Sequence, residues 1–317
     1  MAARYFSSTF ALTLLGVVVS QAARSQSGEA CDRECLIGFA DRFIKSLVAH
    51  EPGRGQLAKT VKYTENGQTL RPGDGFWASV TEDSTYRIYA ADPAAGQVVW
   101  LGVMKEGGTP VIVAVRLRVE AREITQAEAV IARNEPAIPF RPELLASPHP
   151  LFTEAAPSTD RPSREKMLGI VNTYLDGFDE NDSGKGIPFD KECQRIENGL
   201  ETAGATDPSA EPMRKLGCQE QLNTGHSKLI TEVRERRFLV VDDERGLVFA
   251  IEFFDYAGLL KTVRLADGTT LAAPAAMQKP CSLMIANLLK IKEGRIRQIE
   301  AVVVPVPYGM RSGWARR

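Results

Sequence analysis

The tripeptide Glu-Asn-Gly occurs twice in this chain, beginning once at Glu65 and again at Glu197. Each glutamate could act as a general base, and the amide of the following Asn66 or Asn198 could donate to a developing oxyanion. The tripeptide also suits a tight turn, because asparagine tolerates a left-handed backbone and glycine closes the bend. The sequence leaves the catalytic and the structural interpretation open.

Two more glutamates, Glu128 and Glu300, lie in the related stretches ITQAEAV and IRQIEAV. If both stretches are strands, alternation places each glutamate on one face with a glutamine and two aliphatic residues. That face consists of Ile124, Gln126, Glu128 and Val130 in the first stretch, and of Ile296, Gln298, Glu300 and Val302 in the second. Each carboxyl group could be a poised acid, or it could pair with a strand arginine such as Arg116 or Arg118.

His226, in the stretch NTGHSKL, is a further acid–base candidate. A single histidine is more often structural than catalytic, and the order of residues defines no histidine-carboxylate-serine triad. The sequence has no Cys-x-x-Cys motif and only three histidines, so a zinc site is not expected.

Candidate substrate-binding residues are Arg237 and the aromatic residues Trp77 and Tyr308. Arg236-Arg237 and Arg87 stand at matching strand starts and could grip an anionic substrate through paired hydrogen bonds. The arginines could instead pair across the turns with acidic residues, namely Asp92, Asp242 and Asp243. Trp77 and Tyr308 could line a pocket, although aromatic residues at such spacings are usually part of a core.

Seven prolines fall within residues 136–162, and this density predicts an extended linker. The linker separates a first unit, residues 31–135, from a second unit, residues 163–317. Each unit opens with apolar residues at helical spacing, and Ser163 is a reasonable cap for the second helix. Strand-like runs separated by turn signals follow in each unit. This order predicts an α+β architecture in which helices cover one face of an antiparallel meander.

The two units also end alike, because LRVEAREITQAEAV (117–130) aligns without gaps on LKIKEGRIRQIEAV (289–302). Similar stretches in the same order at both ends indicate a tandem duplication. Glu-Asn-Gly recurs after 132 residues and the closing stretch after 172, so the second unit carries about 40 additional residues. They fall in loop-like stretches at 200–222 and 265–282. Because functional loops tend to carry insertions, we expect the working site in the second unit.

The order of these elements resembles a known superfamily. The helical start, the strand bearing Glu-Asn-Gly, the turn LRPGDGFW and the closing EGRIRQIEAV are similar to the cystatin-like cone of nuclear transport factor 2. SnoaL-like cyclases and ketosteroid isomerases share that fold. The resemblance implies two tandem cone domains that pair as an internal pseudo-dimer within a monomer.

The same resemblance implies an apolar pocket for a small molecule and chemistry without a cofactor, of the isomerase, dehydratase or cyclase type. Ketosteroid isomerase-like members place their base on the short strand, where Glu65 and Glu197 lie in this chain. A buried carboxyl group has a raised pKa and transfers protons more readily near neutral pH. The alternative is a secreted protein that binds a hydrophobic ligand without transforming it.

A closer resemblance involves the stretches CDRECL, YTENGQTL, CQRIENG, RRFLVVDDERGLVFAIEFFD and VPYGMRSGW. Together they are similar to a family of secreted double-unit proteins from fungi and bacteria whose function is not established. This resemblance covers nearly the whole chain after the N-terminal segment. It implies the fold and export, and it assigns no catalytic residue.

The N-terminal residues have the features of a signal peptide. Arg4 precedes the apolar stretch FALTLLGVVVS (10–20), which is too short to span a bilayer comfortably. Small residues mark a cleavage site near Ala22, so we expect residues 1–22 to be removed on export to the periplasm or the medium. No second apolar run approaches membrane-spanning length, and no membrane association is expected after processing.

All five cysteines follow this cleavage site, and export would place them in an oxidising compartment. We expect the disulfides Cys193–Cys218 and Cys31–Cys35, the second only if Cys31 lies outside regular helix. One thiol would remain free. The stretch NDS at Asn181 would permit N-glycosylation in a eukaryotic host.

The charges of the chain nearly cancel, with 39 lysines and arginines against 40 acidic residues. Without a basic excess to neutralise phosphates, a dedicated nucleic-acid binder is not expected. The 44% apolar content is that of a globular protein, and 317 residues suffice for two medium-sized domains.

Overall fold

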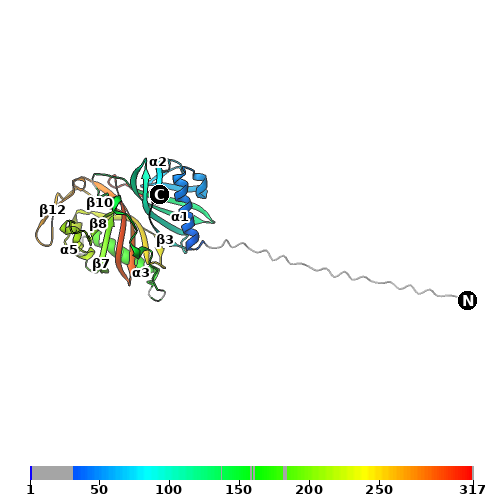
Figure 1. The fold of residues 1–317 in the computed structure, drawn as a ribbon. Coiled ribbons are helices and arrows are strands. Elements are labelled where there is room, and N and C mark those ends of the chain that lie inside the picture. Colours follow the sequence, from blue (N-terminus) through cyan, green and yellow to red (C-terminus); the bar gives the residue numbers. More distant parts are fainter. Residues whose placement is uncertain (2–30, 137, 158, 160, 181–183, 316–317) are drawn as a thin grey trace. The chain divides into compact units, whose positions relative to one another are not determined.

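The computed structural model describes residue 1 and residues 31–136, 138–157, 159, 161–180 and 184–315 (Figure 1). The expected signal peptide, residues 1–22, and the expected glycosylation site at Asn181 lie outside the described residues. No described helix is long and apolar enough to cross a membrane. The architecture is built on two six-stranded sheets.

The first unit begins with helix α1 (Arg33–Val48), which buries its apolar face against the first sheet. The carboxylate of Asp32 caps this helix by accepting a hydrogen bond from the backbone nitrogen of Cys35 at 2.9 Å. Cys31 lies just before the helix and forms a disulfide with Cys35. The helix and the disulfide were both expected from the sequence.

The first sheet has the strand order β2-β1-β6-β5-β4-β3. Its strands are β1 (Leu57–Glu65), β2 (Gln68–Leu70), β3 (Val80–Asp92), β4 (Gln97–Glu106), β5 (Thr109–Glu120) and β6 (Glu123–Ala132). The short helices η1 (Pro52–Gly55) and α2 (Phe76–Ser79) lie in the connections. Strands β3 to β6 form the expected antiparallel meander, whereas β1 is parallel to β6, so the sheet is mixed.

The second unit repeats this arrangement. Ser163 caps helix α3 (Arg164–Asp179), because its Oγ accepts a hydrogen bond from the nitrogen of Lys166 at 3.2 Å. The sheet order is β8-β7-β14-β13-β10-β9, with β7 parallel to β14. Its strands are β7 (Phe189–Glu197), β8 (Leu200–Ala203), β9 (Glu232–Asp242), β10 (Leu247–Tyr256), β13 (Cys281–Lys292) and β14 (Arg295–Val306). Each strand of one sheet therefore has a counterpart at the same place in the other.

The additional residues of the second unit form short elements and not only loops. After β8 come α4 (Pro212–Lys215), α5 (Cys218–Asn223) and η4 (His226–Leu229). After β10 come β11 (Thr262–Arg264), β12 (Thr270–Ala272) and η5 (Ala275–Gln278), with β11 and β12 paired in a small sheet of their own. The expected disulfide Cys193–Cys218 joins β7 to α5.

The proline-rich segment between the units is packed rather than freely extended. It contains the 3-10 helices η2 (Pro142–Leu144) and η3 (Pro150–Phe152). The side chain of Phe152 is fully buried, and Nζ of Lys290 on β13 donates to the carbonyl oxygen of Glu154 at 2.8 Å. The linker therefore contributes to the core of the protein.

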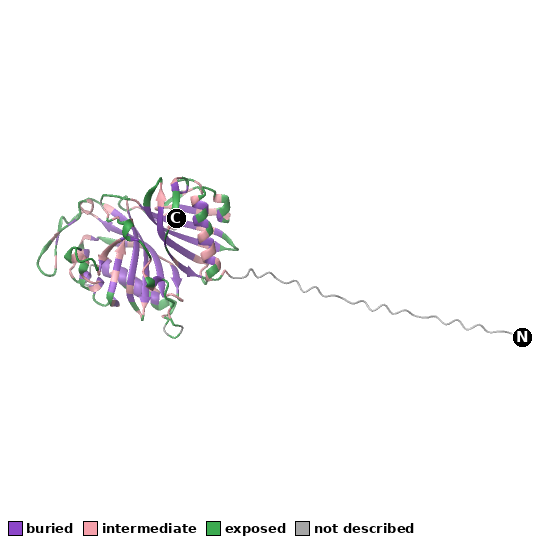
Figure 2. Ribbon diagram, viewed as in Figure 1, coloured by how far each residue is buried: buried purple, intermediate pink, exposed green. Residues whose placement is uncertain are grey.

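Each sheet has an inner face, which packs on the helix of its own unit, and an outer face. The inner faces form one buried cluster with α1 and another with α3. A third buried cluster joins the outer faces of both sheets, through residues such as Val99 and Ile112 of the first and Phe249 and Met284 of the second. Figure 2 shows the strands accordingly as the main buried elements.

A bulge corrects one detail that strand alternation predicted. The register between β5 and β6 shifts by one residue between Gln126 and Ile124. The extra residue turns Ile124 to the inner face, while Glu128 stays on the outer face. A one-residue shift in β14 likewise turns Ile296 to the inner face, whereas Glu300 stays on the outer face. The expectation that each isoleucine shares a face with its glutamate is therefore wrong.

Candidate functional site

The interiors of the two units differ at corresponding positions of the inner face. Trp100 of β4 is opposite Val115 of β5, and Ala250 of β10 is opposite Asn287 of β13. The indole of Trp100 is buried in the first unit, together with Tyr63 and other aromatic residues. At the same place the second unit carries only a methyl group, which leaves space beside Asn287.

The next inner-face position of the same strands shows the reverse exchange, with Gly102 in β4 and Glu252 in β10. A Cβ atom on Gly102 would lie 2.6 Å from the Trp100 ring, so this glycine makes room for the indole. The second unit combines the small Ala250 with the longer, polar Glu252. A large apolar group in one interior is thus replaced by a carboxyl group in the other.

A cavity of about 340 Å³ lies in the second unit. Its apolar walls include Phe178 of α3, Phe254 of β10 and Ile285 of β13. The additional segments complete the walls, through Met277 of η5 and Ile230 after η4. A mainly apolar cavity of this size is typical of a small-molecule site.

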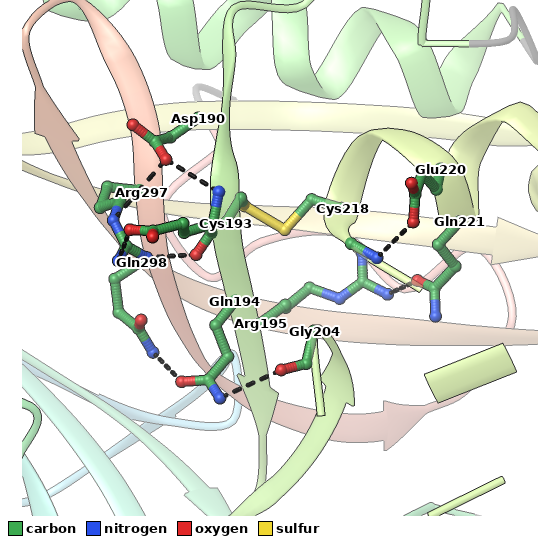
Figure 3. Close-up of a disulfide and its surroundings, with 12 residues drawn as sticks. Asp190, Cys193, Gln194, Arg195, Gly204, Cys218, Glu220, Gln221, Arg297 and Gln298 are labelled. Atoms are coloured by element: carbon green, nitrogen blue, oxygen red, sulfur yellow. Dashed lines mark hydrogen bonds and ion pairs between the residues drawn. A yellow bond between two sulfur atoms is a disulfide. The ribbon is translucent and has the colours of Figure 1, made fainter. Parts of the chain in front are cut away.

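Arg195 and Glu197 of β7 place a charged pair in the cavity wall. Nε of Arg195 lies 3.2 Å from Oε1 of Glu197 and donates to Oγ1 of Thr202 at 3.1 Å. Its Nη2 donates to the side-chain oxygen of Gln221 on α5, as Figure 3 shows. Burial lowers the pKa of Arg195, but Glu197 and nearby tyrosines raise this pKa by more than burial lowers it. The pKa of Arg195 is therefore raised overall. The guanidinium therefore stays charged although only 6% of Arg195 is exposed.

The disulfide Cys193–Cys218 lies near Arg195 (Figure 3). Cys193 precedes Arg195 by two residues on β7, and Cys218 begins the short helix that carries Gln221. The covalent link holds α5 against β7. It thereby keeps the carboxamide of Gln221 within hydrogen-bond distance of the guanidinium.

His226 lines the same cavity from η4. Its Nδ1 lies 2.9 Å from the carbonyl oxygen of Gln221, which can only accept, so Nδ1 carries the proton. Burial and the charge of Arg195 lower the pKa of His226 to about 4. The ring is therefore neutral near pH 7, and its Nε2 is an acceptor.

Tyr174 on α3 and Tyr256 on β10 also line the cavity. Burial raises the pKa of Tyr174 to about 12. Burial and the charge of Glu197 raise the pKa of Tyr256 as well. Both hydroxyls stay protonated near neutral pH, so each can donate a hydrogen bond to a carbonyl oxygen of a bound molecule.

Asn287 on β13 is another polar residue of the cavity wall. Its Nδ2 donates to Oε1 of Glu252 on the neighbouring strand. Glu252 is fully buried, and this burial raises its pKa to about 8. Near neutral pH the carboxyl group is mainly protonated, so the pair adds no full charge to the cavity.

The two Glu-Asn-Gly stretches are the hairpin turns β1–β2 and β7–β8. Asn66 and Asn198 both have a φ of 44°, and the glycines after them have φ of 82° and 83°. Nδ2 and Oδ1 of Asn66 bond to the backbone of Ile131 at 3.1 and 2.7 Å. Asn198 makes the same two bonds with Val303 at 2.8 and 2.9 Å. Both amides serve the fold, so the turn interpretation replaces that of an oxyanion donor.

Glu65 also serves the fold. Its Oε1 accepts hydrogen bonds from the nitrogen of Phe76 at 2.8 Å and from the hydroxyl of Tyr63. Burial raises its pKa. The carboxyl group thus anchors the loop before α2, whereas its counterpart Glu197 lines the cavity. A catalytic role for Glu65 is not supported by these contacts.

Glu128, Glu300 and Arg237 lie between the two sheets and not in the cavity wall. Arg237 Nη2 donates to Glu128 Oε1 at 2.6 Å, and Arg116 lies 3.2 Å from the same carboxylate. Glu300 accepts a hydrogen bond from the hydroxyl of Tyr86 at 2.6 Å. Burial raises the pKa of Glu300 to about 7. The ion-pair alternative holds for Glu128. Arg237 pairs with Glu128 and does not line the cavity, and its substrate-binding role stays a prediction.

The two aromatic candidates do not line the cavity either. Trp77 is fully buried in the first unit, and its Nε1 donates to the carbonyl oxygen of Ser46 at 3.1 Å. Tyr308 is 49% exposed. Arg236 pairs with Asp176 and Asp179 of α3 and not across the turn. For Trp77 the core interpretation is therefore the one that the structure supports.

Of the residues proposed from the sequence, the structure brings Glu197 and His226 together in one cavity. Sequence reasoning missed the other polar residues of the cavity wall and the buried Glu252 beside it: Tyr174, Arg195, Thr202, Gln221, Ser227, Tyr256 and Asn287. One signal was present, because a glutamate interrupts the apolar strand LVFAIEFFD. An alignment of β4 with β10 would have placed this glutamate, Glu252, opposite Gly102 of the first unit.

Residues 160–303 match a family described as a domain of unknown function, DUF8021. No curated protein matches the sequence. Parts of the chain are similar to solved structures. They include an NTF2-like protein of unknown function from Cytophaga hutchinsonii, which is 10% identical and aligns over 31% of this chain and 89% of its own, with a TM-score of 0.26.

A protein of unknown function with a cystatin-like fold from Methylobium petroleophilum is 20% identical, over 49% of this chain and 84% of its own, with a TM-score of 0.28. A candidate isomerase from Bacillus subtilis is 12% identical, over 44% and 87%, with a TM-score of 0.28. Each of these likenesses spans less than half of this chain.

Proposed function

We propose that the second unit is a small-molecule enzyme that transfers protons without a cofactor, of the isomerase, dehydratase or cyclase type. The observation that carries the proposal is the Arg195–Glu197 pair in the wall of an otherwise largely apolar cavity. A carboxylate held beside a buried guanidinium can accept a proton from a carbon acid in that cavity. Protonated hydroxyl groups nearby can stabilise the resulting oxyanion.

In the proposed step, Glu197 removes the proton from the carbon next to a substrate carbonyl group. The C–H electron pair becomes a C=C bond, and the carbonyl pair moves onto oxygen, which accepts a hydrogen bond from Tyr174 or Tyr256. If the ketone carries a β,γ C=C bond, the product of this step is a dienolate, and return of the proton to its γ-carbon re-forms the carbonyl group and completes an isomerisation. Neutral His226 offers an acceptor at Nε2 without adding charge.

The test is the exchange of α-protons of small ketones in D2O, followed by proton NMR with 4-hydroxyacetophenone among the probes. Glu197→Gln is expected to lower the catalysed rate by about 100-fold, the contribution typical of a general base. Glu65→Gln is the matched control in the first unit and should leave the rate unchanged. Equal rates for the wild type and Glu197→Gln, or no catalysed exchange by the wild type, would contradict the proposal.

Binding without catalysis is the second candidate, and the charge balance of the wall favours it. Glu197 already neutralises Arg195, and Thr202 and Gln221 occupy its Nε and Nη2. A wall with paired charges can hold a hydrophobic ligand without reacting with it. In that case native mass spectrometry of protein from its own host would detect a bound ligand, and Glu197→Gln would change affinity only modestly.

We further propose that the two units arose by tandem duplication and pair through their outer faces as an internal pseudo-dimer in a monomer. The identical strand orders and the shared buried cluster support this proposal. Sedimentation equilibrium should give the mass of one chain. A stable dimer in solution would contradict the monomeric part of the proposal.

Export to an oxidising compartment, with cleavage near Ala22, is also part of the proposal. Two disulfides support it, because such bonds persist mainly in oxidising compartments. N-terminal sequencing of the protein from its host should begin just after Ala22. A chain that retains Met1 would contradict the cleavage.

A further inference from the structure

Asn287 and Glu252 form a polar pair on the inner face where the first unit has Val115 and Gly102. Glu252 is fully buried, and Asn287 is 3% exposed. Burial of polar groups costs free energy unless their hydrogen bonds are complete. Because the first unit builds the same strands without such groups, the fold does not require this pair. Asn287 lines the cavity, so a role in binding is a physical reason for the pair.

The pair has hydrogen-bonding capacity to spare. Nδ2 of Asn287 donates to Oε1 of Glu252, and none of the described residues donates to Oδ1 of Asn287. Oε2 of Glu252 is also buried and without a partner among the described residues. Since Glu252 holds Nδ2 and Asn287 lines the cavity, Oδ1 is the amide atom left for a bound molecule.

We infer that Oδ1 of Asn287 accepts a hydrogen bond from a hydroxyl group of the ligand, which is a small, hydroxylated and otherwise apolar ketone. This inference rests on the proposed function, in which the cavity holds the substrate and Tyr174 or Tyr256 faces its carbonyl oxygen. Glu252 acts through Asn287 as a positioning residue. A ligand without the hydroxyl would leave Oδ1 without a donor in a largely dry wall.

The experiment compares acetophenone with 4-hydroxyacetophenone by isothermal titration calorimetry, because the two probes differ in one hydroxyl group. The wild type is expected to bind the hydroxylated probe about tenfold more tightly, the effect of one neutral hydrogen bond. Asn287→Val introduces the residue of the first unit, and the affinity ratio should fall to about one. Asn287→Leu, which is close to asparagine in shape, serves if the valine variant does not fold.

Glu252→Met tests the positioning role, because methionine has a similar length and cannot hold the amide of Asn287. The affinity ratio should fall although Asn287 is intact, which a merely structural role of Glu252 would not cause. Circular dichroism spectra should match those of the wild type.

The outcomes separate this inference from the proposed function. A variant at Asn287 that keeps the tenfold preference would overturn the hydroxyl site, and so would a wild type that binds both probes equally. In both cases the cavity would remain the ligand site. A wild type that binds neither probe and does not exchange their α-protons would overturn the proposed function, and the inference with it.

Discussion

The two units carry the same strand order around two different interiors. In the first, Trp100 and its neighbours fill the inner face of the sheet. In the second, Ala250 stands at the place of Trp100, and a cavity of about 340 Å³ lies on that side of the sheet. The same strand order therefore surrounds a filled core in one unit and a cavity in the other.

The additional segments add to this difference. The second unit has α5 and η4 after its hairpin and β12 and η5 before β13, and residues of all four line the cavity. In the first unit the hairpin leads directly to α2, which inserts Phe76 and Trp77 into the core. In the first unit, aromatic side chains fill the interior next to the hairpin. In the second unit, the additional segments surround a cavity in the corresponding region.

In the filled interior, the largest effect is expected for Trp100→Ala. Removal of a fully buried indole should lower the free energy of unfolding by about 3–5 kcal/mol, measured by urea denaturation. The affinity for 4-hydroxyacetophenone should not change, because the cavity belongs to the other unit. A loss below about 1 kcal/mol would show that the first interior is not tightly packed.

The two disulfides offer a second comparison. Cys193 and Cys218 are separated by 25 residues, whereas Cys31 and Cys35 are separated by 4. Removal of the disulfide that closes the longer loop, by Cys193→Ala/Cys218→Ala, should lower the free energy of unfolding by about 3 kcal/mol. Removal of the disulfide that closes the shorter loop, by Cys31→Ala/Cys35→Ala, should lower it by about 2 kcal/mol. Only the first variant should also weaken ketone binding, because it releases Gln221 from Arg195. Equal effects of both variants on binding would contradict the position of the site.

Stability should also depend on pH through the buried acid of the second interior. The pKa of Glu252 is raised to about 8 from 4.5, so the folded state favours its protonated form. The contribution of Glu252 to the free energy of unfolding is therefore complete below about pH 4.5, and it is lost as the pH rises through 8. At pH 9, Glu252→Gln should be more stable than the wild type by roughly 5 kcal/mol, because each pKa unit corresponds to about 1.4 kcal/mol, and at pH 4 the two should be equally stable.

Urea denaturation at both pH values checks this prediction. Gly102 stands at the matching place of the first unit, so that unit has no carboxyl group to replace. Glu300, between the sheets, has a pKa raised to about 7 and provides a matched variant, Glu300→Gln. A wild type and Glu252→Gln with parallel pH profiles would show that Glu252 is not buried as the structure has it.

Local patterns in the sequence predicted much of the fold. The helix after Ser163 follows from a capping residue and apolar spacing, and both disulfides were expected from the positions of the cysteines after the predicted cleavage site. The meanders follow from apolar runs and turn signals. The parallel pairs β1–β6 and β7–β14 were not predicted, because their strands are far apart in the sequence.

The site was predicted less well, for a physical reason. Glu128 resembles an acid in an apolar strand, but its partner Arg237 comes from the other sheet and depends on how the sheets meet. A bulge decides which face each glutamate occupies, and alternation alone cannot show it. The cavity is lined by residues from α3, β7, β10, β13 and the additional segments, and no local pattern in the sequence shows that these elements meet around an open space.

The most direct test of the central claim is a methyl NMR titration of the isoleucines with 4-hydroxyacetophenone. Ile230 and Ile285 line the cavity, whereas Ile44 and Ile131 belong to the filled interior of the first unit. Saturable chemical-shift changes are expected for the methyl groups of Ile230 and Ile285, and none for those of Ile44 and Ile131. Shifts at Ile44 and Ile131, with Ile230 and Ile285 unchanged, would contradict that claim.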